Sequence, residues 1–218
     1  MVVPSQFPEA SPYHALREVF RRQIDMQFAD LHVALQLPAA SIDPNVGLNL
    51  TTASLLFSLV AGASVLLYEP NWRAFKTGAG SGSRFKAALK EAYPWQDDDR
   101  LSGAAAAELL YKWARNPLVH SLGIGKDRHA IPAAPGAQPY DRILFVKWAL
   151  SADQVQQLAQ GSLTRPPWLP GTVTHDDVSI EFSVPTLAWG THVMWRALIA
   201  DYGHAAERIS ARVLGWAA

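Results

Sequence analysis

The stretch LTTASLLFSLVAGASVLLY, residues 50–68, decides the fold of this chain, because it is apolar and contains no charged residue. It lies in an uncharged segment from Pro44 to Tyr68 that is about long enough to cross a bilayer. However, it holds five serine or threonine residues and lacks the basic flanks and aromatic belts of a typical membrane span. We therefore predict a buried helix from about Leu50 to Glu69, stopped by Pro70, at the centre of a helical bundle and not in a membrane.

Helical patterns lie on both sides of this apolar segment. Residues 13–37, YHALREVFRRQIDMQFADLHVALQL, repeat apolar side chains at the three-and-four spacing of one helical face. Two further helices are predicted for SRFKAALKEAY, residues 83–93, and for GAAAAELLYKWARNPLVHSLGIG, residues 103–125, the second of which Ser102 can cap. The first 125 residues therefore predict a bundle of four helices.

The second half of the chain has a different pattern. RILFVKWAL at 142–150 is rich in β-branched and aromatic residues, and VSIEFSV at 178–184 alternates apolar with polar residues, so each predicts a strand. Between them, Ser151 and Gln154 form the capping box of a short helix, which Gly161 ends.

Together these patterns predict a mainly α fold. It consists of a four-helix bundle over residues 1–125, followed over residues 126–218 by a small two-stranded β insertion and C-terminal helices at 186–216. We expect both parts to pack on the same core as one globular unit, since 218 residues suffice for one ordinary domain.

Composition narrows the classes of function. The absence of cysteine excludes a disulfide scaffold, a zinc–thiolate site, an iron–sulfur cluster and a thiol nucleophile. Because 19 basic residues balance 19 acidic ones, any contact with nucleic acid must use a local basic patch. Only 17% of residues are charged, against about 25% in an average soluble domain, so we expect a second copy of the chain to cover apolar surface. The N-terminal sequence has no secretory signal pattern, which predicts a cytoplasmic protein.

The most informative motif lies in the helix predicted at 103–125. Arg115 is followed directly by Asn116, and His120 stands five positions after the arginine. Pro117 lies between them, where it removes one backbone hydrogen bond and predicts a kink or a break near Arg115 and Asn116. On an unbroken helix Arg115 and His120 would lie roughly 140° apart, so the break decides whether they can share one phosphate.

This motif resembles the signature of the HEPN superfamily, in which a few residues separate an arginine from a histidine and a polar residue often follows the arginine. The resemblance covers roughly residues 11–125, as helix order and motif position. It implies a homodimeric, metal-independent endoribonuclease without a cofactor, in which two copies of the motif face each other across the dimer interface. RNA is then the expected substrate, and an antitoxin-like protein is a candidate partner.

These residue types also suit RNA cleavage on chemical grounds. His120 can exchange a proton near neutral pH, and Arg115 presents a permanently charged fork to a phosphate. Asn116 can orient the imidazole or donate to a non-bridging oxygen. Trp113 is a candidate to stack a base. A basic run soon after the motif is the candidate phosphate-binding rim, formed by Lys126, Arg128 and His129.

A different interpretation of the motif stays open at this point. Arg115 can instead be the cation of a helix C-terminus, Asn116 its C-cap and His120 a partly buried histidine bonded to a carbonyl. The chain would then be a non-catalytic helical protein that binds a nucleotide or a protein partner.

Two other sets of residues carry side chains that can react or bind a metal. The first set has side chains of the kind that bind a divalent metal. However, aspartate is also common in a turn before a strand, so we predict no metal site there. Its members are His175, Asp176, Asp177 and Glu181. The other set, His192 and Trp195, lies in an apolar helix and is predicted to pack rather than to react.

Overall fold

The computed structural model describes residues 14–38, 48–68, 80–95, 101–115, 142–175 and 179–200. Its helices there are α1 (His14–Gln36), α2 (Leu48–Tyr68), α3 (Ser81–Ala92), α4 (Gly103–Leu109), the π-helix η2 (Leu110–Arg115), α6 (Ala152–Ala159) and α7 (Val184–Ala200). The strands are β1 (Arg142–Val146), β2 (Val173–His175) and β3 (Ser179–Ser183). The described part of the chain is therefore mainly helical, with one three-stranded sheet.

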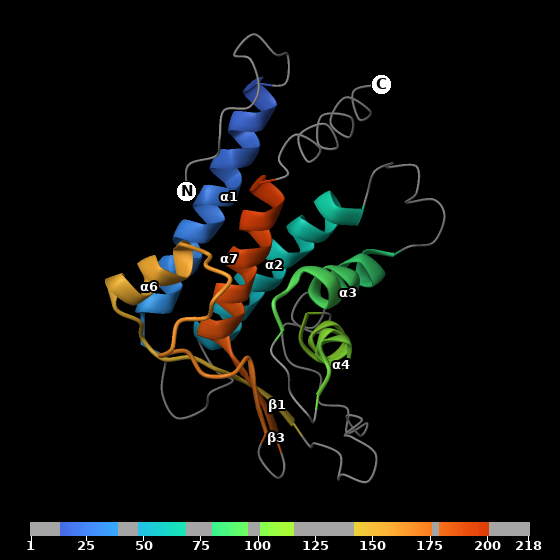
Figure 1. Cartoon of the computed structure of the whole chain (residues 1–218), viewed down its shortest axis with the longest axis vertical. Helices are drawn as coiled ribbons and strands as arrows, with labels where there is room; N and C mark the ends of the chain where they lie inside the picture. The colour runs from blue at the N-terminus through green and yellow to red at the C-terminus, as the bar shows by residue number, and fades with distance from the viewer. Residues whose placement is uncertain are drawn as a thin grey trace.

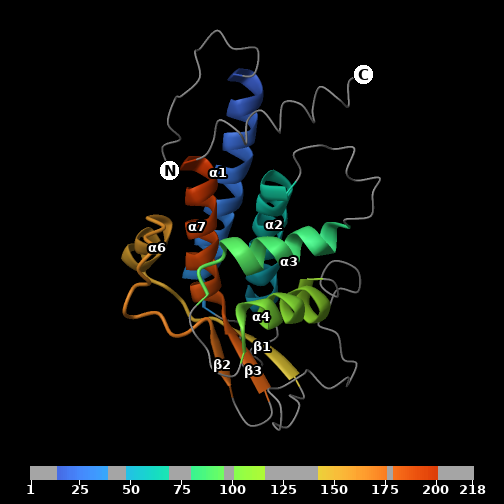
Figure 2. The same ribbon diagram turned by 45° about the vertical axis from the view of Figure 1, so that its right-hand side comes forward.

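The apolar helix α2 is the element around which the other helices pack. It contacts α1, α3 and α7, and its N-terminal end lies near β1 (Figures 1 and 2). Leu56, Phe57 and Val60 are buried in these contacts, whereas Thr51 and Ser58 remain exposed. The prediction of a central buried helix is confirmed. Among the described helices, none has both the length and the hydropathy that a membrane span requires.

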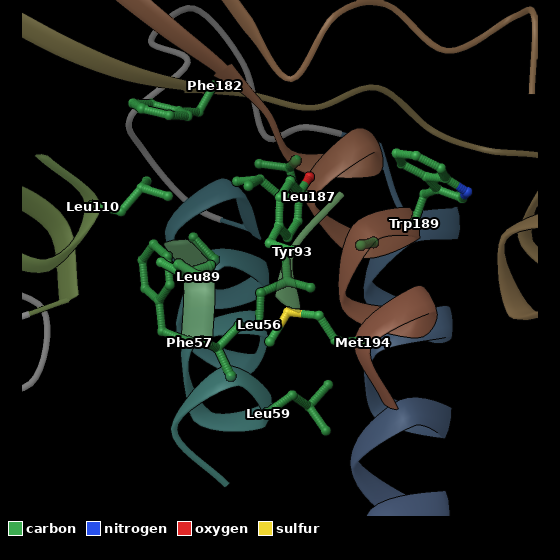
Figure 3. Packing of buried hydrophobic residues seen from close by; sticks show 14 of the residues in the cluster. Leu56, Phe57, Leu59, Leu89, Tyr93, Leu110, Phe182, Leu187, Trp189 and Met194 are labelled. Atoms are coloured by element: carbon green, nitrogen blue, oxygen red, sulfur yellow. The ribbon is translucent and has the colours of Figure 1, made fainter. Parts of the chain in front are cut away.

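One hydrophobic core joins residues from both halves of the chain. The Phe57 ring of α2 meets the Phe145 ring of β1 edge-on at 5.8 Å between centroids, and Phe145 stacks on Phe182 of β3 at 5.8 Å. Tyr93 and Met194 extend the core between α2 and α7 (Figure 3). Burial of each large apolar side chain stabilises the fold by about 1.5–3 kcal/mol, so the sheet and the helices depend on each other.

The residues predicted to cap the helices do so in the structure. The Ser102 hydroxyl accepts a hydrogen bond from the Ala105 amide at 3.3 Å and caps α4. Ser151 and Gln154 form the predicted capping box of α6, with bonds of 2.9 and 3.2 Å in the two directions. Gly161 follows α6 with a φ of 57°, a conformation that costs a side-chain-bearing residue about 1 kcal/mol or more.

The sheet has three strands, where the sequence predicted two. β3 is the central strand, with β1 parallel on one side and β2 antiparallel on the other. β2 covers only Val173–His175, where the sequence predicted no strand. A strand of three residues is too short to show an alternating pattern, so only its pairing with β3 makes it visible.

β1 is also shorter than predicted, because it ends at Val146 and not near Leu150. The next residue, Lys147, is only 5% exposed, and its ammonium group donates to the Leu37 carbonyl just beyond the end of α1. The Leu150 amide also donates to α1, at the Leu35 carbonyl over 3.0 Å. Residues 147–150 therefore leave the sheet to satisfy carbonyl groups at the C-terminal end of α1, which are otherwise without partners.

The helix predicted over 103–125 is α-helical only as far as Leu109. From Leu110 to Arg115 it widens into the π-helix η2, so the distortion starts well before the position expected from Pro117. A proline at 117 lacks the amide that would bond the carbonyl of residue 113 in an α-helix, which weakens the last turn before it. Single π-helical turns are uncommon and frequently occur at functional sites.

Candidate functional site

Arg115 is the one residue of the predicted catalytic motif that lies within the described part of the chain. It ends η2 and is half-buried. Trp113 lies in the same π-helix, but its side chain is outside the described set. The remaining predicted site residues also fall outside the described residues: Asn116, His120, Lys126, Arg128 and His129.

Two aromatic rings hold the Arg115 side chain. The guanidinium carbon lies 6.0 Å from the centroid of Phe85 in α3 and 5.7 Å from that of Tyr111 in η2. The two rings contact each other at 6.0 Å between centroids, so they form one support for the cation. Each such contact is worth about 0.5–1 kcal/mol at a partly exposed site, which is enough to restrict a long side chain.

The charges around Arg115 leave its own charge uncompensated within the described structure. Lys86 also lies over the Tyr111 ring, at 5.6 Å, but its ammonium group pairs with the Glu108 carboxylate at 2.6 Å. No carboxylate of the described residues forms an ion pair with Arg115. The aromatic rings therefore position this cation without neutralising it, which suits the binding of an anion.

Gly82 of α3 leaves room for the Tyr111 ring, and we predict that Gly82→Ala destabilises the protein by about 1–3 kcal/mol. A Cβ at this position would lie 2.2 Å from Oη and 2.3 Å from Cζ of Tyr111, so the ring would have to move and Arg115 would lose one support. Urea unfolding measures the change. Ser83→Ala, at the next and exposed position, is the control and should stay within about 0.5 kcal/mol of wild type. Equal unfolding free energies for the two variants would contradict the prediction.

A second group of polar side chains lies away from the predicted motif, where α1 meets α7. The Nε2 atoms of His32 and His192 are 3.0 Å apart, and Phe28 stacks on the His192 ring at 4.2 Å between centroids. His192 is only 1% exposed, whereas His32 is half-buried. The other ring nitrogen of His192, Nδ1, is buried and has no hydrogen-bond partner in the described structure.

Both histidines of this pair are neutral at pH 7. Burial, and after it the neighbouring His32, lower the pKa of His192 to about 3. Burial also lowers the pKa of His32. Two neutral imidazoles can share one hydrogen bond, in which one Nε2 donates and the other accepts. The hydrogen bond therefore links α1 to α7 as long as at least one of the two Nε2 atoms is unprotonated and can accept.

The sequence indicated only part of this arrangement. The prediction that His192 and Trp195 pack in an apolar helix is confirmed, since Trp195 is buried and donates to the Leu59 carbonyl at 3.2 Å. His32 follows Phe28 by four positions, which placed it at the edge of the apolar face of its helix. No pattern in the sequence connects two residues that are 160 positions apart.

Two of the donors considered for a divalent metal near β2, His175 and Glu181, lie on different faces of the sheet. His175 of β2 stands opposite Ile180 in the sheet, and Thr174 stands opposite Glu181. Because neighbouring positions of a strand face opposite sides of a sheet, His175 and Glu181 lie on different faces. The other two members of that set, Asp176 and Asp177, are outside the described residues.

Comparison of this chain with known proteins gives no match. The chain matches no protein-family model, no curated protein and no solved structure. A functional assignment must therefore rest on the chemistry of the residues themselves.

Proposed function

We propose that this chain is a HEPN-like, metal-independent endoribonuclease that acts as a homodimer. In this proposal Arg115, Asn116 and His120 form the catalytic set of each copy. Lys126, Arg128 and His129 form a phosphate-binding rim beside it. A mainly helical fold around an apolar central helix supports the proposal, as does the position of Arg115 at the end of a distorted helix.

The setting of Arg115 is the observation that carries the proposal. A structural arginine at a helix end would be expected to pair with a carboxylate or with terminal carbonyls. Arg115 instead rests on Phe85 and Tyr111 without a carboxylate partner among the described residues. In a chain with no net charge, such a held cation provides the local attraction that a phosphate requires.

The proposed reaction uses the 2′-hydroxyl of RNA as the nucleophile. The 2′-oxygen attacks the adjacent phosphorus and the bond to the 5′-oxygen breaks, so the products are a 2′,3′-cyclic phosphate and a 5′-hydroxyl. One His120 removes the 2′-hydroxyl proton, and the His120 of the second copy protonates the leaving 5′-oxygen. Arg115 stabilises the negative charge on the pentacoordinate phosphorus, and Asn116 orients the imidazole.

We expect the wild-type protein to cleave a labelled single-stranded RNA in the presence of EDTA and to leave cyclic phosphate ends. His120→Ala and Arg115→Ala should each slow cleavage by about 100-fold or more, since each removes a proton-transfer or charge-stabilising group. Cleavage rates from gel analysis and the product termini from mass spectrometry test both statements. Light scattering should give the mass of a dimer for all variants.

Arg22→Ala is the matched control for the removal of an arginine, since Arg22 is exposed on α1 and outside the proposed site. It should cleave at the wild-type rate. Equal cleavage by wild type and His120→Ala would refute the catalytic assignment, and so would an absence of cleavage by the wild-type dimer. RNA or nucleotide binding without cleavage would favour the non-catalytic alternative.

A further inference from the structure

The part of the molecule around Arg115 is locally basic, although the chain as a whole has no net charge. α3 packs beside α4 and η2 (Figure 2), and residues 80–95 and 101–115 hold more basic than acidic side chains. The basic residues are Arg84, Lys86, Lys90, Lys112 and Arg115, and the acidic ones are Glu91 and Glu108. We propose that a single RNA strand binds here at two phosphates, one at Arg115 and a neighbouring one at Lys86. The proposal rests on the ribonuclease function above, because it gives the same substrate a second contact.

Lys86 and Arg115 lie against the same aromatic ring. The Lys86 ammonium nitrogen is 5.6 Å from the centroid of the Tyr111 ring, and the Arg115 guanidinium carbon is 5.7 Å from it. The two cations are therefore no more than about 11 Å apart. A nucleic-acid strand carries one phosphate per about 3.4 Å of helix axis, so this spacing lies within about three nucleotides. Phosphates of one strand can contact both cations.

The ion pair of Lys86 with Glu108 does not prevent this contact. The two charged groups are 2.6 Å apart, and the side chains are 31% and 59% exposed. An ion pair as exposed as this one contributes little to stability, because water and salt screen it. A phosphate offers Lys86 another anion, and its binding releases counterions from the RNA. The phosphate therefore replaces Glu108, whose negative charge limits the affinity for RNA.

The second contact determines which RNA the site prefers. A dinucleotide has a single phosphate, which must lie at Arg115 when its bond is cleaved, so Lys86 has nothing to bind. A longer strand adds a neighbouring phosphate for Lys86. This phosphate does not react, so Lys86 binds it equally in the substrate complex and in the transition state. Such a contact lowers KM and leaves kcat unchanged. Lys86 is thus a positioning residue for single strands longer than a dinucleotide.

Cleavage of a dinucleotide and of a tetranucleotide by the full-length protein tests this preference. Lys86→Gln should raise KM for the tetranucleotide by about three- to tenfold, with kcat unchanged and with no effect on the dinucleotide. Glu108→Gln should lower KM for the tetranucleotide, because the phosphate no longer competes with a carboxylate. The double variant should bind more weakly than Glu108→Gln alone, since both then lack the carboxylate and only one keeps the lysine.

Matched controls come from α1, where Arg22 and Asp30 are exposed. Arg22→Gln and Asp30→Asn change the net charge as the two test variants do, but outside the proposed site. Both should keep the wild-type KM for the tetranucleotide. An unchanged KM in Lys86→Gln would overturn the proposal, and so would a double variant that matches Glu108→Gln. An effect of Lys86→Gln on kcat alone would also contradict it.

Binding measured without cleavage separates this proposal from the ribonuclease function. In the His120→Ala background, fluorescence anisotropy of a labelled single-stranded RNA reports binding alone. Lys86→Gln should reduce the slope of log affinity against log salt by about 0.7, the contribution of one phosphate contact in a single strand. Binding that depends on Lys86 would support the second contact even if the wild-type protein cleaves no RNA. An unchanged slope, or no RNA binding at all, would refute it.

Discussion

Gly190→Ala is expected to lower the free energy of unfolding by about 3 kcal/mol, which is a large part of the stability of a domain of this size. A Cβ on this α7 residue would lie 2.1 Å from Cε2 and 2.3 Å from Cζ of Tyr93. The Tyr93 ring cannot move away easily, because it is only 4% exposed, lies between α2 and α7 and donates to the Thr186 carbonyl at 3.0 Å (Figure 3). Urea denaturation followed by circular dichroism measures the loss.

Gly62→Ala on α2 is the matched control for this substitution. Its Cβ would lie 3.5 Å from the Trp195 ring, an ordinary contact, and alanine favours a helix over glycine by about 0.5–1 kcal/mol. We expect this variant to be as stable as wild type or slightly more stable. The double variant Gly190→Ala with Tyr93→Leu should lose less stability than the two single losses together, since the smaller side chain makes room. Simple additivity of the two losses would show that the Tyr93 contact is not the cause.

Acidification should destabilise the protein through His192. The pKa of this histidine is about 3 in the folded state, against 6.5 for an ordinary histidine, so between these values the unfolded chain binds a proton that the folded chain excludes. The full stability is present above about pH 6.5 and decreases as the pH falls. The loss from this group reaches about 2 kcal/mol at pH 5 and roughly 4 kcal/mol at pH 3. The lowered pKa of His32 acts in the same direction.

Urea denaturation at several pH values between 7 and 4 measures this loss. His192→Phe is the informative comparison, because it keeps an aromatic ring on Phe28 and removes the group that titrates. Its unfolding free energy should fall less steeply with decreasing pH than that of wild type. Parallel curves for the two proteins would show that His192 does not carry the pH dependence.

Features that depend on residues close together in the sequence were predicted correctly, whereas features that depend on more distant residues were missed. The N-cap at Ser102, the capping box of α6 and the central apolar helix depend on residues a few positions apart, and the structure confirms them. β2 was missed because its three residues acquire their conformation only by pairing with β3. The early change to a π-helix at Leu110 was missed too, since a local rule places the effect of a proline next to the proline.

The same distinction between local and distant residues applies to the candidate sites. The motif of Arg115, Asn116 and His120 is contiguous, so it can be recognised in the sequence and its chemistry proposed from residue types. The support that Phe85 and Tyr111 give to Arg115 requires α3 to pack beside η2, which no spacing in the sequence encodes. The pairing of His32 with His192 depends on packing between the N-terminal and C-terminal helices.

For this protein, the amino-acid sequence by itself determined that the segments of α1, α2, α3 and α6 form helices and that α2 is buried. Those properties follow from periodicity, caps and proline, which act within one or two helical turns. The tertiary structure alone decided which rings hold Arg115, that three strands form the sheet, and that two neutral histidines meet between α1 and α7. Such contacts exist only when burial of apolar surface brings distant segments together, because the chain itself encodes no distance between them.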